Sequence, residues 1–192
     1  MIAEEFWNWF DENKSLLEDL ISGANSDYEI YETLSDKLEK YSEFLIPELT
    51  KNEKNNFVLV ISCDGNRNGI EFANSLTQNL RKFENWEIVK FRQPGPMEFI
   101  PLYNVNFSRS NIFLKWEKSS NKYYITFFVK NYFSSNPDYE ISTLLHMDHT
   151  IGEYNSMAKI YGAEIKKLGF FQSKKDLKTL DDLKNEPDSN FA

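Results

Sequence analysis

The amino-acid sequence predicts an α+β fold: an N-terminal αα-hairpin packed with a mixed or antiparallel sheet of about five strands, and two to three further helices. Two amphipathic helical stretches open the chain and a continuous apolar run follows them. The helices and strands predicted after them neither alternate strictly along the chain nor fall into separate blocks, which favours an α+β fold. With 192 residues, the chain is expected to be a single domain, with an acidic αα-hairpin at 1–50 and an α+β sandwich body at 57–184.

The two N-terminal helices are predicted from apolar residues that recur every three or four positions. Ala3–Ser22 carries the first stripe, and Gly23 supplies a helix stop. The second stripe consists of Tyr31, Leu34, Leu38, Tyr41 and Leu45. Pro47 is expected to follow the end of this helix, because helices usually end at or before the residue that precedes a proline. The short link implies an antiparallel helix pair, and the polar stretch Thr50–Asn56 is the expected subdomain boundary.

A β-α-β segment is predicted next. Phe57–Cys63 is apolar almost throughout, which is typical of a strand buried on both faces. Asp64–Gly69 predicts a turn, Gly69–Phe83 a helix and Trp86–Arg92 a second strand. The remaining predicted elements are a short strand in Tyr103–Phe107, a hairpin of Asn111–Lys118 and Lys122–Val129, a helix from Pro137 or Asp138 to Ile151, a strand at Met157–Leu168 whose spacing also tolerates a helix, and a short helix at Lys174–Lys184.

The net charge of −8 is concentrated at the N-terminus. Residues 1–56 hold 14 acidic and 5 basic side chains, whereas residues 57–192 hold 16 acidic and 17 basic ones. Binding to duplex nucleic acid or to an anionic membrane needs a cationic face, and the nearest features are the pairs Lys166-Lys167 and Lys174-Lys175. We therefore expect no nucleic-acid and no membrane partner. The acidic hairpin suits a basic protein partner, or it is an ordinary solvated helix surface.

Composition bounds the class of protein. Cys63 is the single cysteine, so no intramolecular disulfide framework exists. The acidic first residues do not match a signal peptide, and no apolar stretch is long enough to span a bilayer. We expect a soluble cytoplasmic protein, of bacterial origin from its abundant Asn and Lys. No cofactor fingerprint, nucleophile elbow or Cys–His constellation is present, so no cofactor is expected.

The predicted turn matches half of a calcium loop. Asp64-Gly65-Asn66-Arg67-Asn68-Gly69 has the oxygen ligands and the glycine of such a loop. The twelfth position, where a glutamate would close the ligand shell, is Ser75, and the eighth, usually apolar, is Glu71. An Asx-rich strand-to-helix turn is the favoured interpretation, with calcium as the alternative.

A second near-motif for metal is formed by His146, His149 and Glu153, which are three and four residues apart. Imidazole and carboxylate ligands suit zinc or iron, yet the glutamate of a metalloprotease motif is absent. On a helical wheel these residues point away from the apolar stripe, toward the flank or outer face of the helix. Surface histidines are therefore favoured over a metal site.

Asp148 falls within the apolar stripe of the same predicted helix, which consists of Ile141, Leu144, Leu145 and Ile151. A carboxylate there must be paired or hydrogen-bonded. We expect Asp148 to be buried and to accept at least two hydrogen bonds, with Arg92, a ring N–H or hydroxyl, and backbone amides as candidate donors. A structural anchor is the favoured role, with a catalytic group of shifted pKa as the alternative.

Four segments together resemble a family of uncharacterised bacterial proteins, a domain of unknown function. They are Phe6-Trp7-x-Trp9-Phe10, Ile61-Ser62-Cys63-Asp64-Gly65, Trp86-Glu87-Ile88-Val89 with Phe91-Arg92, and Met147-Asp148-His149-Thr150-Ile151-Gly152-Glu153-Tyr154. The last is similar to a Leu-Asp-x-x-Leu-Gly-Glu motif, with Met147 and Ile151 in place of leucines. The resemblance spans most of residues 5–168 and implies an α+β fold, with no established activity.

Without a catalytic constellation, the sequence favours a non-enzymatic protein-binding module, accessory or immunity-like in role. The alternative is an enzyme or small-ligand binder whose site lies near Asp64, Arg92, Asp148 and Glu153. A deep pocket that joins these residues would favour the alternative.

Overall fold

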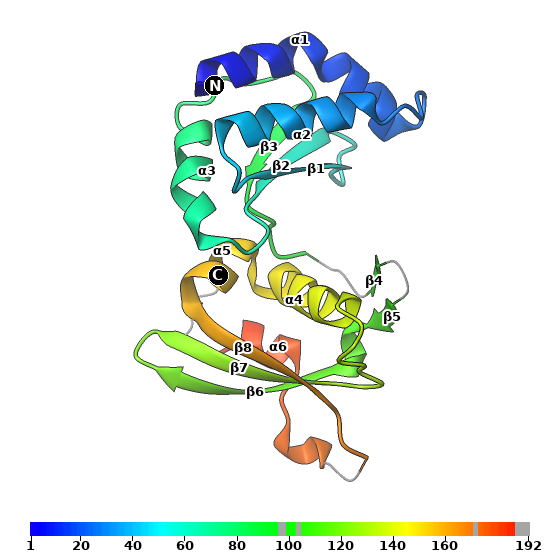
Figure 1. The fold of residues 1–192 in the computed structure, drawn as a ribbon, viewed down its shortest axis with the longest axis vertical. Helices are drawn as coiled ribbons and strands as arrows, with labels where there is room; N and C mark the ends of the chain where they lie inside the picture. The colour runs from blue at the N-terminus through cyan, green and yellow to red at the C-terminus, as the bar shows by residue number, and fades with distance from the viewer. Residues whose placement is uncertain (96–98, 103–104, 171–172, 187–192) are drawn as a thin grey trace. The chain divides into compact units, whose positions relative to one another are not determined.

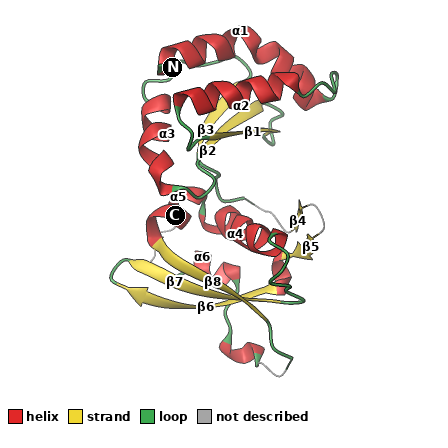
Figure 2. Cartoon of the chain, in the orientation of Figure 1, coloured by secondary structure: helices red, strands yellow, loops and turns green. Residues whose placement is uncertain are grey.

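The structure is a computed structural model that describes residues 1–95, 99–102, 105–170 and 173–186. The chain divides into two units, Met1–Arg92 and Gln93–Ala192, each with its own sheet (Figures 1 and 2). The unit boundary follows Arg92, and unit 1 contains the two N-terminal helices together with the first three strands.

Unit 1 contains three α-helices and three strands. In chain order they are α1 (Ala3–Ser22), α2 (Glu29–Tyr41), β1 (Ile46–Lys51), β2 (Phe57–Ser62), α3 (Ile70–Thr77), preceded by a 3-10 turn at Arg67–Gly69, and β3 (Trp86–Lys90). The sheet order is β1-β2-β3, with β1 antiparallel and β3 parallel to β2. The helix α1 has the predicted bounds and ends at Gly23, whose left-handed φ of 73° lets its N–H reach the carbonyls of Asp19 and Leu20.

An aromatic cluster joins α1 to the sheet of unit 1. The ring of Phe10 meets Phe83 and Trp86 edge-to-face at centroid distances of 5.1 and 5.0 Å. Trp7 packs beside Phe10, and its indole N–H donates to the carbonyl of Leu76 at the end of α3, at 2.7 Å. Edge-to-face pairs add about 0.5–1.5 kcal/mol beyond the burial of their area. The N-terminal aromatic motif therefore holds the core together.

The strand β1 corrects the predicted course of the second helix. That helix was expected to reach Leu45, but α2 ends at Tyr41, and Ser42 is extended. The Ser42 hydroxyl accepts the N–H of Phe44 at 3.3 Å, which turns the chain into β1. Pro47 is tolerated there because β1 is an edge strand, paired only with β2. Pro47 thus marks a strand and not a helix end.

Unit 2 contains five strands and three α-helices in its described residues. They are β4 (Phe99–Leu102), β5 (Val105–Ser108), β6 (Ile112–Ser119), β7 (Lys122–Val129), α4 (Asp138–Ile151), α5 (Glu153–Lys159), β8 (Ile160–Lys167) and α6 (Leu180–Lys184). The strands β4 and β5 form an antiparallel pair; of the short strand predicted at Tyr103–Phe107, residues 103 and 104 lie outside the described residues. The predicted helix at Lys174–Lys184 is split into a 3-10 turn at Lys174–Asp176 and α6.

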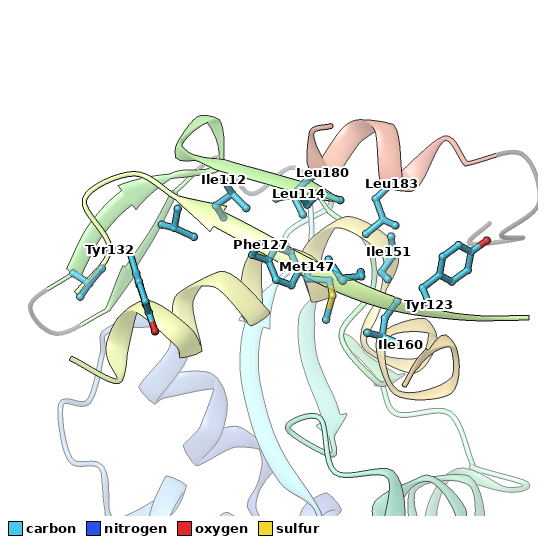
Figure 3. Packing of buried hydrophobic residues seen from close by; sticks show 13 residues of the cluster. Ile112, Leu114, Tyr123, Phe127, Tyr132, Met147, Ile151, Ile160, Leu180 and Leu183 are labelled. Atoms are coloured by element: carbon cyan, nitrogen blue, oxygen red, sulfur yellow. The ribbon is translucent and has the colours of Figure 1, made fainter. Parts of the chain in front are cut away.

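The larger sheet of unit 2 carries the core of this unit. Its order is β6-β7-β8, with β6 antiparallel and β8 parallel to β7. Alternate residues of β7 point into a hydrophobic cluster that α4 and α6 complete (Figure 3). The labelled members include Ile112, Leu114, Tyr123, Phe127, Met147, Ile151, Leu180 and Leu183. The strand predicted at Lys122–Val129 has these bounds in the structure, and its burial alternates as it does in a strand with one face in the core.

The two units share one connectivity. In each, an antiparallel strand pair is followed by helix and then by a third strand parallel to the second: β1-β2-α3-β3 and β6-β7-α4-α5-β8. The α+β class and the N-terminal helix pair are confirmed. The expected single sheet of about five strands is wrong, because the described residues form two three-stranded sheets and one two-stranded sheet. Within the described part of the chain, four α-helices follow the N-terminal pair, and not two to three.

Candidate functional site

Arg92 lies at the carboxyl end of β3, where the backbone takes an unusual turn. Phe91 is buried and has a left-handed φ of 63°, which is uncommon for a bulky residue. Its N–H still donates to the carbonyl of Ile61 at 3.0 Å, so the pairing with β2 continues up to this point. The turn follows that last ladder bond and precedes Arg92. Strained backbone of this kind persists only where the surroundings hold it.

Arg92 joins a carboxylate of β1 to a carboxylate of the loop that follows β2. Its Nε donates to Oε1 of Glu48 in β1 at 2.5 Å, and a terminal nitrogen donates to Oδ1 of Asp64 at 2.7 Å. Arg92 is 8% exposed, whereas the side chain of Asp64 is 57% exposed. We call these three residues the Arg92 cluster. One cation against two carboxylates leaves the cluster with a formal charge of −1, and charge-assisted bonds of this length are strong.

Glu48 is the member of this cluster that sequence reasoning missed. The segment around it was interpreted as a helix end, so no partner strand was expected there. The signal that was available is the short run Glu48-Leu49-Thr50 after the proline, in which polar and apolar residues alternate. In the ladder, Glu48 lies opposite Val60 of β2.

The loop that follows β2 is an Asx turn, as the favoured interpretation predicted. Asp64 and Gly65 have φ of 46° and 77°, and Asn66 Oδ1 accepts the N–H of Asn68 at 3.0 Å. The N–H of Gly69 donates to the carbonyl of Asn66, also at 3.0 Å. The side chains of Asp64 and Asn66 thus take part in contacts within the protein. No group of three or more His, Cys, Asp or Glu in the described ranges is arranged to hold a metal ion.

Gly69 is needed at the end of this loop because of a close approach. A Cβ at this position would lie 2.6 Å from the sulfur of Cys63 and 2.8 Å from the carbonyl oxygen of Phe44. Cys63 is buried, as predicted for a core thiol. The tight packing holds the start of α3 against the end of β2, and so fixes the loop that carries Asp64.

The helices α4 and α5 carry a second group of polar candidates. Seven polar residues on them are buried: Ser142, Thr143, His146, Asp148, Thr150, Glu153 and Ser156. Asp148 is 6% exposed, so its predicted burial is confirmed. The apolar stripe used to predict it is wrong in its first half, because Ile141 and Leu144 are exposed. Its predicted hydrogen bonds remain a prediction.

The histidine prediction needs a correction. His146 was expected on the flank or outer face of the helix, but it is fully buried, and His149 is half-buried. Glu153 is also buried, and it does not continue the face of the histidines. The reason is Gly152, whose φ of 84° ends α4, so that Glu153 begins a separate helix, α5. His146, His149 and Glu153 therefore do not share one helical face, although their spacing in the sequence is helical.

Arg109 ties α4 to α6 and was not a sequence candidate. One terminal nitrogen donates to the hydroxyl of Thr150 and the other to Asp181, both at 2.6 Å. The Thr150 hydroxyl in turn donates to the carbonyl of His146 at 2.6 Å. These bonds fasten the last turn of α4, next to Asp148 and Gly152.

The predicted four-residue site is distributed over both units. Asp64 and Arg92 are brought together in unit 1, while Asp148 and Glu153 belong to unit 2. A common site for all four stays a prediction.

An acidic face runs along α2. Five exposed carboxylates step by three and four residues along this helix and just past its end: Glu29, Glu32, Asp36, Glu39 and Glu43. We call these five residues the α2 acidic face. None of them forms an ion pair within residues 1–95. Lys37, on the same helix, lies over the ring of Trp9 at 5.9 Å.

A shallow hollow of about 350 Å³ interrupts this face, lined by Asp36, Glu39 and Lys40. On α1, Asp11 is neutralised by Lys14, and the hydrogen bond from Lys14 lowers the pKa of Asp11 below its usual value. By contrast, the carboxylates of the α2 acidic face have no such ion pair within residues 1–95.

No family model, curated protein or solved structure matches this chain. No helix among the described residues combines the length and the apolar character that crossing a bilayer requires.

Proposed function

We propose that this chain is a non-enzymatic protein-binding module, accessory or immunity-like in role, that takes a basic protein partner on the α2 acidic face. The observation that carries the proposal is the set of five exposed carboxylates without an ion pair within residues 1–95, four of them on one side of α2 and Glu43 just past its end. Like charges four residues apart destabilise a helix by about 0.2–0.5 kcal/mol per pair. A partner that brings lysines or arginines to this face would relieve that repulsion.

The hollow beside Asp36 and Glu39 supports a protein partner in preference to a small ligand. It is open and lined by three charged side chains, whereas small-ligand sites are concave and mostly apolar. A row of carboxylates over several helical turns fits an extended basic surface, and it would accelerate encounter with that surface.

A quantitative pull-down from the native host tests the proposal. The bait proteins are the wild type and the variant Glu32→Gln/Asp36→Asn/Glu39→Gln, which removes three charges and keeps side-chain shape. The control is Glu71→Gln/Glu84→Gln/Glu117→Gln, which removes three exposed charges elsewhere. A basic partner recovered with the wild type and the control, but depleted at least tenfold with the α2 variant, supports the proposal. Equal recovery with all three baits contradicts it.

The second candidate is a small-ligand site at the Arg92 cluster, which the sequence hypothesis extends to Asp148 and Glu153. It is favoured by the position of Asp64 and Arg92 at the carboxyl ends of the parallel strands β2 and β3, where open α/β sheets bind ligands. A thermal-shift panel of metabolites tests it. A compound that raises the Tm of the wild type but not of Asp64→Asn would support this site, and a panel without such a compound would leave the cluster a structural anchor.

A further inference from the structure

The β6-β7-β8 sheet of unit 2 has two unlike faces. One face is the core, where buried residues alternate along β7 and meet Met147 of α4 and Leu183 of α6. Figure 1 shows both helices on one side of this sheet. Because successive side chains of a strand point to opposite faces, the residues between the core positions form the second face.

The strand pairing fixes which residues of the second face are neighbours, because paired residues of adjacent strands point to the same side. Phe128 of β7 lies between Phe113 of β6 and Lys166 of β8, and two parallel rows follow along the strands. The nine residues, row by row, are Phe113, Phe128 and Lys166; Lys115, Thr126 and Glu164; and Glu117, Tyr124 and Gly162. We call these nine residues the outer sheet face, and each of them is exposed or half-buried.

Three aromatic rings belong to the outer sheet face. Phe113 and Phe128 are directly opposite in the antiparallel ladder, and Tyr124 lies four residues from Phe128, about 13 Å along β7. The Tyr124 ring occupies the space that Gly162 leaves, because a Cβ there would lie 2.8 Å from two ring carbons. Tyr161 adds a fourth ring, 45% exposed, with its centroid 5.7 Å from that of Tyr124. Rings therefore lie at both ends of the face.

Lysines border these rings. The ammonium groups of Lys174 and Lys130 lie 5.2 and 5.9 Å from the centroid of the Phe113 ring. Lys166 is the ladder neighbour of Phe128. Together with two lysines of β6 and β7 that share this side of the sheet, the cations of the outer sheet face and its border are Lys115, Lys122, Lys130, Lys166 and Lys174.

Two carboxylates of the outer sheet face oppose these cations. Glu164 pairs with Lys166 at 2.8 Å, and both partners are about half exposed, so the pair is weak. Glu117 is exposed at the far end of β6. Five lysines against two carboxylates leave a formal charge of +3, in a chain whose net charge is −8. The face is a cationic area on an anionic protein.

We propose that the outer sheet face binds single-stranded nucleic acid, with bases stacked on Phe113, Phe128 and Tyr124 and phosphates at the bordering lysines. Sheets whose aromatic side chains stack on two or three unpaired bases are a recurring mode of RNA recognition. Rings combined with a cationic surface also suit single-stranded DNA, because every base has a π-face. Duplex bases are already stacked on one another and cannot reach the rings. This surface lies in unit 2 and is independent of the protein-binding function proposed for α2.

The proposal revises the expectation of no nucleic-acid partner. That expectation was drawn from the lack of a cationic block along the sequence. The lysines of the outer sheet face come from different strands and loops, and the pairing of β6, β7 and β8 brings them beside the rings. Sequence order alone does not reveal this arrangement.

Fluorescence anisotropy with the full chain tests the proposal. The probes are labelled oligouridine and oligothymidine strands of about 20 nucleotides, and a duplex of the same length. The wild type should bind the single strands at least tenfold more tightly than the duplex. The slope of log K against log salt should be about −2 to −4, as expected for three to five phosphate contacts. Tighter binding of oligouridine and equal binding of both strands each support the proposal, the first with recognition of the 2′-hydroxyl.

Two sets of variants separate the rings from the lysines. Phe113→Leu/Phe128→Leu keeps apolar side chains and removes two stacking surfaces, and it should weaken binding at least tenfold. Lys115→Gln/Lys166→Gln alters exposed positions only, and it should weaken binding at least fivefold and make the salt slope shallower by about 1.4. The matched controls in unit 1 are Phe57→Leu, at a half-buried ring, and Lys54→Gln/Lys82→Gln, which should bind within twofold of the wild type.

Three outcomes would overturn the proposal. The first is that the wild type binds neither single strand at low salt, or binds the duplex as tightly. The second is that the lysine variant retains the wild-type affinity and salt slope, a result that can be read even if the leucine variant does not fold. The third is that the leucine variant folds and binds like the wild type while heparin binds more tightly than either strand, which would reassign the lysines to an anionic polysaccharide.

Discussion

Arg92 and Asp64 form an ion pair of 2.7 Å at the carboxyl ends of β3 and β2. Both residues follow a strand of the same parallel pair, and a residue with left-handed backbone lies at or next to each of them, Asp64 itself and Phe91. The guanidinium is buried and also binds Glu48 of β1. This pair therefore links all three strands of unit 1 at one edge of the sheet.

Removal of the Arg92 guanidinium should destabilise unit 1. Arg92→Ala leaves Glu48 and Asp64 without their shared cation, and we expect a loss of about 2–4 kcal/mol in the free energy of unfolding. Asp64→Asn should lose about 1 kcal/mol, because Asp64 is largely exposed. Urea unfolding measures both. The control Arg81→Ala removes an exposed pair with Asp11 and should change stability by less than about 1 kcal/mol. Equal losses for Arg92→Ala and Arg81→Ala would contradict the role of the cluster.

Gly69 should resist substitution for steric reasons. A methyl group at Gly69 overlaps the Cys63 sulfur and the Phe44 carbonyl, so Gly69→Ala should lose about 1–3 kcal/mol. In the Cys63→Ala background the same change should cost less, because one of the two overlaps is gone. Gly23→Ala is the comparison: it meets open space, and its penalty of about 1 kcal/mol reflects the left-handed φ alone. Chemical denaturation of Gly69→Ala, Cys63→Ala, the double variant and Gly23→Ala measures these losses. If the losses of Gly69→Ala and Cys63→Ala add fully in the double variant, the close approach of Gly69 to the Cys63 sulfur is contradicted.

Asp148 should act as a buried anchor at the end of α4. Asp148→Ala should lower the free energy of unfolding by about 1–3 kcal/mol for each donor left unsatisfied, whereas Asp148→Asn keeps shape and acceptor capacity and should lose less. The exposed neighbour variant Leu144→Ala should stay within about 0.5 kcal/mol of the wild type. If Asp148→Asn folds with wild-type stability but loses binding to the partner, Asp148 is functional and the anchor assignment is wrong.

Asp182 should make the stability of α6 depend on pH. The backbone N–H and then the hydroxyl of Thr179, at 2.7 and 2.8 Å, lower the pKa of Asp182 below its usual value. A depressed folded pKa means that the stabilisation is present above the unfolded pKa and is lost as pH falls through the folded one. The Tm deficit of Asp182→Asn should therefore be visible near pH 7 and shrink below about pH 3. A deficit that is constant over this range would contradict the cap, and Asp176→Asn is the control.

The sequence predicted elements whose signal is local. The stripe of α1 with Gly23, the strand β7 and the turn at Asp64–Gly69 depend on neighbouring residues, and the structure has all three. The strand β1 was missed because Pro47 stops a helix and is equally acceptable on an edge strand. The choice between the two depends on pairing with β2, which is not a local property.

The candidate sites show the same limit. Arg92 and Asp64 were both singled out, but their common partner Glu48 comes from the missed strand. The burial of His146 and Glu153 escaped prediction because exposed Ile141 and Leu144 gave a misleading inward direction and Gly152 breaks the helix between them. The position of Glu48 depends on tertiary contacts, and that of Glu153 depends on Gly152. Neither effect changes the local pattern of apolar residues from which the predictions were made.

The salt dependence of partner binding tests the central proposal most directly. The affinity of the recovered partner for the wild type should fall steeply as NaCl rises from about 50 to about 500 mM, because exposed charges are screened beyond about 8 Å at physiological ionic strength. Glu32→Gln/Asp36→Asn/Glu39→Gln should bind more weakly at low salt and show a shallower slope. An affinity that is indifferent to salt, with equal Kd for wild type and variant, would contradict binding through the α2 acidic face.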